Sequence, residues 1–172
     1  MAAAGGGLPF ELRVETHEGL MALTRAIRAE ADGKELRKDL AKNMREALKP
    51  AAAEAKSKIM AMSSAGPGTS PALRSSIARK IRPEVKLGGR WTGARVKAFK
   101  TKNVRGFPNA PKRTNRPRGW RHLVYGRADS WVTQYGKNHW FDNAMEGIEP
   151  NAKAAVHGAM EDMARRLAAR IG

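Results

Sequence analysis

Hydrophobic residues in the N-terminal part of the chain recur every three or four positions, which is the spacing of one face of an α-helix. The longest series with this spacing is Leu36, Leu40, Met44, Ala47, Leu48, Ala51, Ala55, Ile59 and Met62. We therefore predict a long helix over 36–62. Pro50 lies inside it, and its ring removes a backbone hydrogen bond and crowds the preceding turn. The helix should kink or divide near that residue.

Shorter elements are predicted around this helix. Apolar and charged residues alternate over 10–14, which suits a short strand or extended arm. Residues 20–32 show helical spacing and end at Asp-Gly, a helix stop. The Ser- and Gly-rich segment 63–70 breaks the chain before a short helix over 71–80. From Glu149 a closing helix carries Ala, Val, Met and Leu along one face.

The middle of the chain has a β-like pattern. Residues 85–98 alternate apolar and charged positions around a Gly88-Gly89 turn. Residues 100–119 contain three prolines and no apolar period, so we predict an extended, basic, Pro-rich loop. Residues 120–135 return to extended character. The pattern therefore predicts an antiparallel β-meander with a long basic loop.

The order of these elements predicts an α+β fold. We expect residues 1–8 to form a flexible leader and 9–172 to form a single domain, since a chain of 172 residues is long enough for one core. Within it we expect a long N-terminal helix kinked near Pro50, then a short helix, the meander, and a C-terminal helix packed on the sheet.

Positive charge is concentrated in one part of the chain. Between Glu84 and Asp129 there is no carboxylate but there are thirteen Lys and Arg, most of the formal net charge of +17. Such loading repels itself, and a polyanion bound through counterion release would offset it. A solvated loop without a partner is the alternative. The candidate DNA- or partner-facing residues are Lys97, Lys100, Lys102, Arg105, Lys112, Arg113, Arg116, Arg118 and Arg121.

Aromatic residues interleave with these cations. Trp91 and Phe107 lie among glycines and cations, and we predict that they sit at an interface. From residue 120 onward, the large aromatics are Trp120, Tyr125, Trp131, Tyr135, Trp140 and Phe141. They can act as stacking platforms for bases, or they can form the core between the sheet and the C-terminal helix. The core role is favoured, because large aromatics dominate burial in an alanine-rich domain.

The residue types and spacings argue against an enzyme. The chain has no cysteine, and its four histidines are far apart, so we predict neither a metal site nor a cofactor. His122, Asp129 and Ser130 are the residue types of a hydrolase triad, but no nucleophile elbow is present. No run of eighteen apolar residues and no secretory signal occurs, so we expect a soluble protein with no membrane partner.

Several short segments share a pattern with a known virus family. They are Ala55-Lys56, Gly66-Pro67-Gly68-Thr69, Leu73-Arg74-Ser75-Ser76-Ile77, Val124-Tyr125-Gly126, Tyr135-Gly136 and His139-Trp140-Phe141-Asp142-Asn143-Ala144-Met145. In this order they resemble the tail-completion or head–tail joining proteins in the neck of lambda-like long-tailed bacteriophages. The resemblance runs, with gaps, from about Leu36 to the C-terminus.

The resemblance implies a structural virion protein without enzymatic activity, assembled in the host cytoplasm and located in the neck. Its copies would form a ring, commonly six-fold, between the head connector or adaptor and the tail tube or terminator. Head-to-tail contacts that close on themselves build such a ring. The leader 1–8 and the loop 100–119 would be arms that order on neighbouring subunits. The cations would face genomic double-stranded DNA in the lumen or acidic patches on adjacent rings.

Two other functions fit the same residues. A free, non-specific nucleic-acid-binding protein of ribosomal or chromatin type would use the acid-free segment to contact phosphates. A tail terminator ring of the same architecture would differ only in its position within a particle. Salt-dependent DNA binding by a protein that forms no rings would favour the first of these alternatives.

Overall fold

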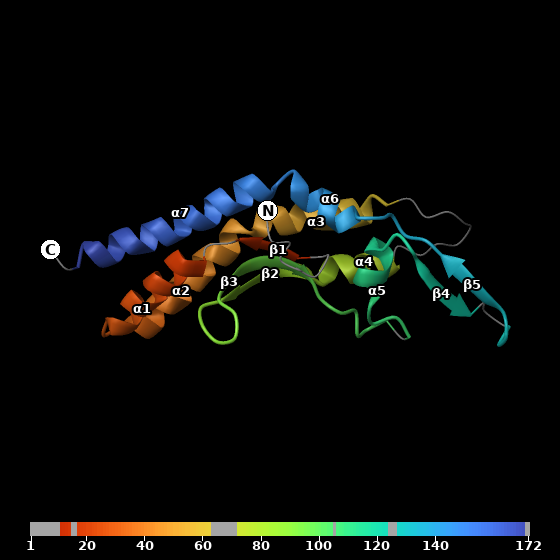
Figure 1. Ribbon diagram of the computed structural model, residues 1–172, viewed down its shortest axis with the longest axis horizontal. Helices are drawn as coiled ribbons and strands as arrows, with labels where there is room; N and C mark the ends of the chain where they lie inside the picture. The colour runs from red at the N-terminus through yellow and green to blue at the C-terminus, as the bar shows by residue number, and fades with distance from the viewer. Residues whose placement is uncertain (1–10, 15–16, 63–71, 105, 124–126, 171–172) are drawn as a thin grey trace, which may run out of the picture. The chain divides into compact units, whose positions relative to one another are not determined.

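The computed structural model describes residues 11–14, 17–62, 72–104, 106–123 and 127–170 (Figure 1). Its helices are α1 (His17–Ala29), α2 (Gly33–Ala47), α3 (Lys49–Met60), α4 (Ala72–Arg79), α5 (Ala110–Asn115), α6 (Trp140–Glu146) and α7 (Glu149–Ala168). Its strands are β1 (Glu11–Val14), β2 (Ile81–Lys86), β3 (Gly93–Ala98), β4 (Trp120–Leu123) and β5 (Trp131–Gln134). The predicted leader 1–8 and the breaker 63–70 lie outside the described residues.

The protein combines helices with small antiparallel sheets, which confirms the α+β class. A three-stranded sheet has the order β1-β3-β2, and the strand predicted over 10–14 supplies its β1 edge. β4 and β5 form a separate antiparallel pair. We predicted one continuous meander, but the strands form two sheets because helix α5 separates β3 from β4.

The chain divides into two compact units, and neither is a single continuous segment. One consists of Met1–Glu11, Glu54–Ile81 and Ala98–Glu146, and we call it the hairpin unit. The other consists of Leu12–Ala53, Arg82–Lys97 and Gly147–Gly172, and we call it the helical unit. The prediction of a single domain over 9–172 depends on whether the two units fold as one, and it stays a prediction.

The helical unit has a core of helices with apolar stripes. Leu20 and Ile27 of α1 and Leu40 and Met44 of α2 are fully buried, and they follow the predicted spacing. We predicted that α7 packs on the sheet. In the helical unit, however, α7 packs most extensively on α2 and also on α1. Its stripe is narrow and rich in Ala and Met, so it fits the groove of another helix closely.

The break near Pro50 is present as predicted. α2 ends at Ala47 and α3 begins at Lys49, so that Leu48 alone separates them and Pro50 is the second residue of α3. A proline is tolerated in the first turn of a helix because a nitrogen there has no intrahelical acceptor. Leu48 is fully buried, which keeps the apolar stripe continuous through the break.

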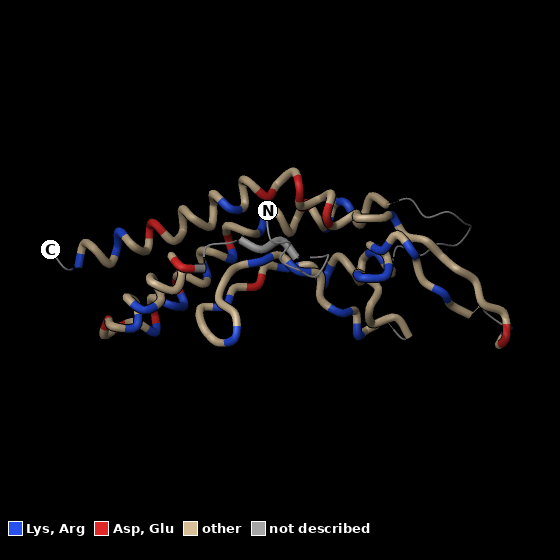
Figure 2. The backbone as a smooth tube through the Cα atoms, in the orientation of Figure 1, with Lys and Arg blue, Asp and Glu red and all other residues tan. Residues whose placement is uncertain are grey.

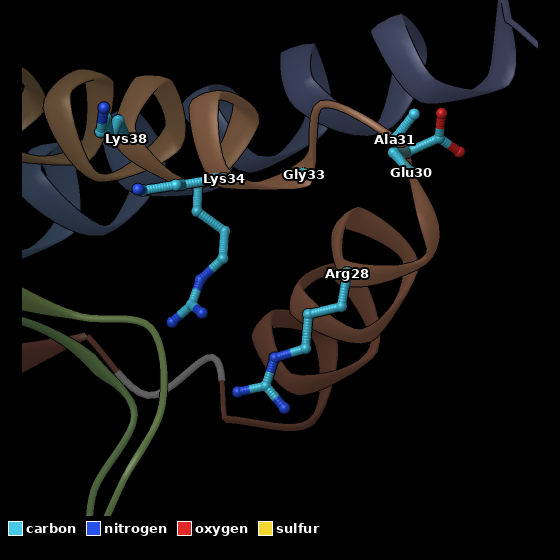
Figure 3. A pocket seen from close by; sticks show the side chains of 7 residues that line it. Arg28, Glu30, Ala31, Gly33, Lys34 and Lys38 are labelled. Carbon is cyan, nitrogen blue, oxygen red and sulfur yellow. The ribbon is translucent and has the colours of Figure 1, made fainter.

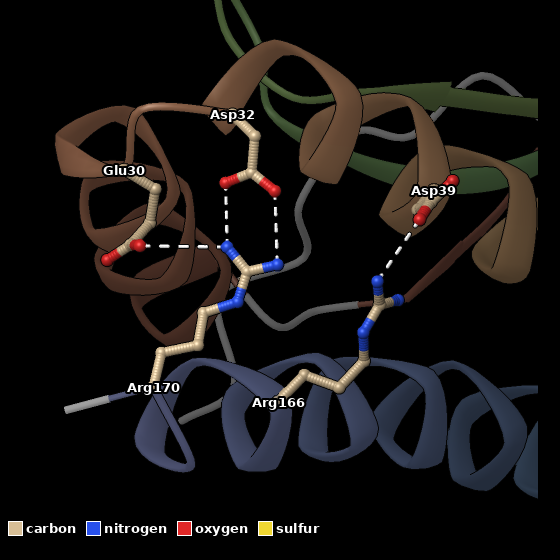
Figure 4. Close-up of polar contacts among 5 residues, drawn as sticks. All are labelled: Glu30, Asp32, Asp39, Arg166 and Arg170. Atoms are coloured by element: carbon tan, nitrogen blue, oxygen red, sulfur yellow. Dashed lines mark hydrogen bonds and ion pairs between the residues drawn. The ribbon is translucent and has the colours of Figure 1, made fainter. Parts of the chain in front are cut away.

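Ion pairs tie the end of α7 to the α1–α2 turn (Figure 4). The Arg170 guanidinium donates to both carboxylate oxygens of Asp32, at 2.7 and 3.0 Å, and lies 3.7 Å from Glu30. Arg166 donates to Asp39 at 3.2 Å. The hydrogen bonds from Arg170 lower the pKa of Asp32 below its ordinary value of 3.8. These groups are solvent-exposed, so the pairs orient α7 more than they stabilise it.

In the hairpin unit, buried side chains of α5 hold the start of α6. Asn115 accepts a hydrogen bond from the Phe141 backbone nitrogen at 3.0 Å and donates to the Asp142 carboxylate at 2.9 Å. The hydroxyl of Thr114 accepts from the Trp140 indole nitrogen at 3.2 Å. Both α5 residues are almost fully buried. The junction therefore satisfies donors at the first turn of α6 that have no partner within the helix.

Removing the Arg170 side chain should weaken the protein in a pH-dependent way. Because the folded pKa of Asp32 is depressed, its contribution is present above 3.8 and is lost as the pH falls through the folded value. We expect Arg170→Met to lower the urea midpoint at pH 6 and to lose this difference as the pH falls from 3.8 through the folded value. Lys42→Met, an exposed α2 cation with no carboxylate partner in the described residues, is the control. A difference that persists in acid would contradict the prediction.

Asn115→Ala should destabilise the hairpin unit. The substitution leaves the buried backbone nitrogen of Phe141 without its acceptor, which costs about 1–3 kcal/mol. The measurement is the free energy of unfolding from urea titration. Asn143→Ala, on the exposed side of the same helix α6, should change it by no more than about 0.5 kcal/mol. Equal losses in the two variants would show that the junction does not carry the stability.

Candidate functional site

The 100–119 segment, predicted to be an extended loop, contains helix α5. Ala110 and Pro111 begin this helix, and four of its six residues are buried. The prediction was wrong here because prolines were interpreted as marks of extended structure. A proline in the first turn of a helix is favourable. Lys112 and Arg113 on this helix and Arg116 at its end are therefore attached to a buried anchor.

β4 and β5 form a two-stranded ribbon in which Trp120 pairs with Gln134 and Leu123 pairs with Trp131. Paired residues share a face, and faces alternate along each strand. One face consequently carries Arg121, Leu123, Trp131 and Thr133, and the other carries Trp120, His122, Val132 and Gln134.

Two glycines position the base of this ribbon. Gly119 has φ +59°, and a Cβ there would overlap the carbonyl oxygen of Gln134 on the opposite strand. A Cβ on Gly136 would overlap the carbonyl oxygen of Thr114 in α5. At Gly119 only glycine combines the left-handed conformation with so close an approach, and at Gly136 the close approach alone excludes a side chain. The ribbon therefore leaves α5 at a defined place.

The ribbon exposes large hydrophobic side chains on both faces. The exposed fractions are 42% for Leu123, 53% for Trp131 and 40% for Val132, and Tyr135 just beyond β5 is 66% exposed. Every residue of β5 is exposed. A two-stranded hairpin is marginally stable in water unless another layer covers it. In the hairpin unit, this surface has the character of one that a partner covers.

The aromatics preferred as core residues differ in burial, and Trp120 is half-buried. Trp140 and Phe141 are buried and meet edge to face with ring centroids 5.6 Å apart, which confirms that they are core residues, and they lie beside α5 in the hairpin unit. Trp131 and Tyr135 are exposed, so their assignment to the core was wrong. Sequence alternation identifies a strand but not whether anything covers its faces. Tyr125 lies outside the described residues.

The structure places most of the candidate cations in the hairpin unit (Figure 2). Lys112 and Arg113 are half-buried on α5. Lys97 lies on β3 in the helical unit and is also half-buried. Arg105 lies outside the described residues. The exposed members of the set are Lys100, Lys102, Arg116, Arg118 and Arg121. Of these, Lys100, Lys102, Arg116 and Arg118 form no ion pair with a described carboxylate.

The two predicted interface aromatics have different surroundings. Phe107 packs on Trp120 with ring centroids 5.2 Å apart, and the Arg113 guanidinium lies 5.5 Å from the Phe107 ring. This contact joins the 100–119 segment to the base of the ribbon. Nearby on the ribbon, Arg121 lies 5.7 Å from the Trp131 ring. The hairpin unit thus combines cations and exposed aromatics, as surfaces that bind single strands or proteins do.

Trp91 lies in the helical unit, in the turn between β2 and β3. Lys86 lies 5.2 Å and Arg95 4.1 Å from its ring. Arg95 is buried and donates to Glu84 at 2.6 Å, so it is held as a fixed platform under the indole. Trp91 remains half-exposed, and its interface role stays a prediction.

The residue types of a hydrolase triad lie on β4 and in the segment that leads into β5. His122 Nδ1 lies 2.9 Å from the carbonyl oxygen of Leu123, and Asp129 is exposed beyond β4. No three His, Asp or Glu side chains of the described ranges gather where they could hold a metal ion. None of the helices in those ranges is long and apolar enough to cross a bilayer.

No protein-family model matches this chain, and neither a curated protein nor a solved structure matches it.

Proposed function

We propose that the protein is a structural component of a bacteriophage neck, forming a ring that joins the DNA-filled head connector to the tail. The observation that carries this proposal is the β4–β5 ribbon, whose apolar side chains are exposed on both faces. A second copy that covers the ribbon removes about 25 cal/mol of unfavourable hydration per Å² of apolar surface. Head-to-tail contacts of this kind close into a cyclic ring, six-fold by the family resemblance.

The ribbon is suited to a contact between subunits. Within the described part of the chain, β4 and β5 pair only with each other, so each offers an outer edge as well as apolar side chains, and an exposed edge pairs readily with another chain. Gly119 lets the start of β4 lie close to the end of β5, and Gly136 lets the end of the ribbon lie close to α5. The direction of the ribbon within the hairpin unit is therefore defined. A defined direction matters because a ring closes only if every subunit repeats the same rotation.

The cations indicate what the ring encloses or touches. Segment Ala98–Glu146 contains ten Lys and Arg but three Asp and Glu. Copies brought together in a ring place these charges near one another, and a polyanion offsets the repulsion. Genomic double-stranded DNA in the lumen, bound without sequence specificity, is the partner that we propose. The neighbouring rings are the connector and the tail tube or terminator.

Replacing the exposed aromatics of the ribbon should abolish self-association. We expect purified wild-type protein to form rings, visible by negative-stain imaging and by light scattering. Trp131→Ser with Tyr135→Ser should weaken association at least about a hundredfold, because buried aromatics dominate interface energies. Met60→Ser removes a comparably exposed hydrophobic side chain on α3 and should leave rings unchanged. A wild-type protein that remains monomeric at high concentration, or rings in the double variant, would refute the proposal.

Reversing exposed charges should weaken DNA binding without abolishing rings. The variant is Lys102→Glu, Arg116→Glu and Arg118→Glu, and the measurement is the affinity for random-sequence duplex DNA over a range of salt concentrations. The slope of log affinity against log salt should fall by about one for each phosphate that the variant no longer neutralises. Lys42→Glu, Arg45→Glu and Lys56→Glu, exposed cations on helices outside the 100–121 set, make a charge-matched control. Salt-dependent binding by a wild-type monomer would instead favour the free nucleic-acid-binding alternative, and equal slopes would exclude the cations from DNA binding.

A further inference from the structure

A basic hollow lies in the helical unit where α1, the α1–α2 turn and the first turns of α2 meet (Figure 3). Its volume is about 440 Å³. The side chains that line it include Arg28, Lys34, Arg37 and Lys38, with Glu30 as its single acid. Figure 3 shows the Glu30 carboxylate pointing away from the Arg28 guanidinium, and it lies 3.7 Å from Arg170.

Two guanidinium groups converge beside the β2–β3 turn. A Cβ placed on Gly88 would lie 3.2 Å from Arg28 Nη2 and 3.5 Å from Arg37 Nη2. The two nitrogens are therefore within about 7 Å of each other, although they come from different helices. Gly88 has φ +150°, and its missing side chain leaves the space into which both arginines reach.

The two arginines differ in how firmly they are held. Arg37 donates from Nη2 to the carbonyl oxygen of Leu87 at 2.7 Å, which fixes its guanidinium beside the turn. Arg28 and Lys34 form no ion pair with the rest of the described chain. Lys38 pairs with Glu35 at 2.8 Å. The hollow thus keeps three cationic groups without a neutralising carboxylate, an arrangement that a bound anion stabilises.

We propose that this hollow binds a phosphate group, with Arg28 and Arg37 as its two principal donors and Lys34 at its rim. A carboxylate has two oxygens in one plane, and a single arginine satisfies it bidentately. Donors that approach from two helices are better matched by the tetrahedral oxygens of phosphate. The site lies in the helical unit, away in sequence from the 100–121 cations, and it does not depend on the proposed neck function.

The test measures binding of inorganic phosphate to the full-length protein by calorimetry, at constant ionic strength with chloride as the background anion. Arg28→Gln should weaken phosphate affinity about tenfold, since it removes a charge-assisted hydrogen bond. Arg28→Lys should recover only part of the loss, because it keeps the charge but not the planar fork. Arg25→Gln, an exposed cation three residues earlier on α1, should bind like wild type.

A competition experiment identifies the source of the phosphate. Displacement of inorganic phosphate by a short duplex DNA, lost in Arg28→Gln, would assign the site to a nucleic-acid backbone. Phosphate binding that DNA does not displace would assign it to a free phosphate or phosphorylated small molecule. Equal phosphate affinity in Arg28→Gln and Arg25→Gln would overturn the proposal. So would tight binding of a hexaglutamate peptide by a wild type that binds no phosphate, because the hollow would then be a site for acidic protein segments.

Discussion

A two-stranded ribbon cannot bury both of its own faces, and the β4–β5 pair exposes hydrophobic side chains on each. The helical unit satisfies its apolar stripes internally, since α1, α2 and α7 cover one another. The ribbon has no such cover among the described residues of its unit. Its exposed tryptophan and tyrosine therefore constrain the function more strongly than the net charge does.

The ribbon depends on the junction that holds it. α5 is short, yet its buried Thr114 and Asn115 bind the first turn of α6, and the Thr114 backbone lies against Gly136 at the end of the ribbon. One small polar cluster therefore sets the positions of α6 and of the ribbon together. The Phe107–Trp120 contact adds a second tie between the 100–119 segment and β4. A rigid base is what an arm needs if it is to present the same surface in every copy.

Sequence patterns predicted the elements correctly where one periodicity dominated, and incorrectly where a single residue type, such as proline, was misinterpreted. The Leu36, Leu40 and Met44 series became α2, and the break fell next to Pro50. Helix α5 was missed because its proline looked like a breaker, although it stands in the first turn. The exposure of Trp131 was not predicted, because apolar and polar residues alternate in the same way in strands whose faces are covered and in strands whose faces are exposed. The basic hollow was missed for another reason: Arg28, Arg37 and Gly88 come from two helices and a turn, and only the packing of α1 and α2 beside that turn brings them together.

The exposed apolar side chains of the ribbon and most of the candidate cations belong to the same unit. Hydrophobic attraction between copies and charge repulsion between them would therefore oppose each other. In the proposed ring, association through the ribbon would bring hairpin units together, and with them the cations of 98–146, whose mutual repulsion would grow with every copy added. Without an anion, this repulsion opposes the hydrophobic gain from covering Trp131 and its neighbours. With an anion between the copies, the two contributions act in the same direction. The proposed ring would therefore assemble more favourably around a polyanion than in its absence.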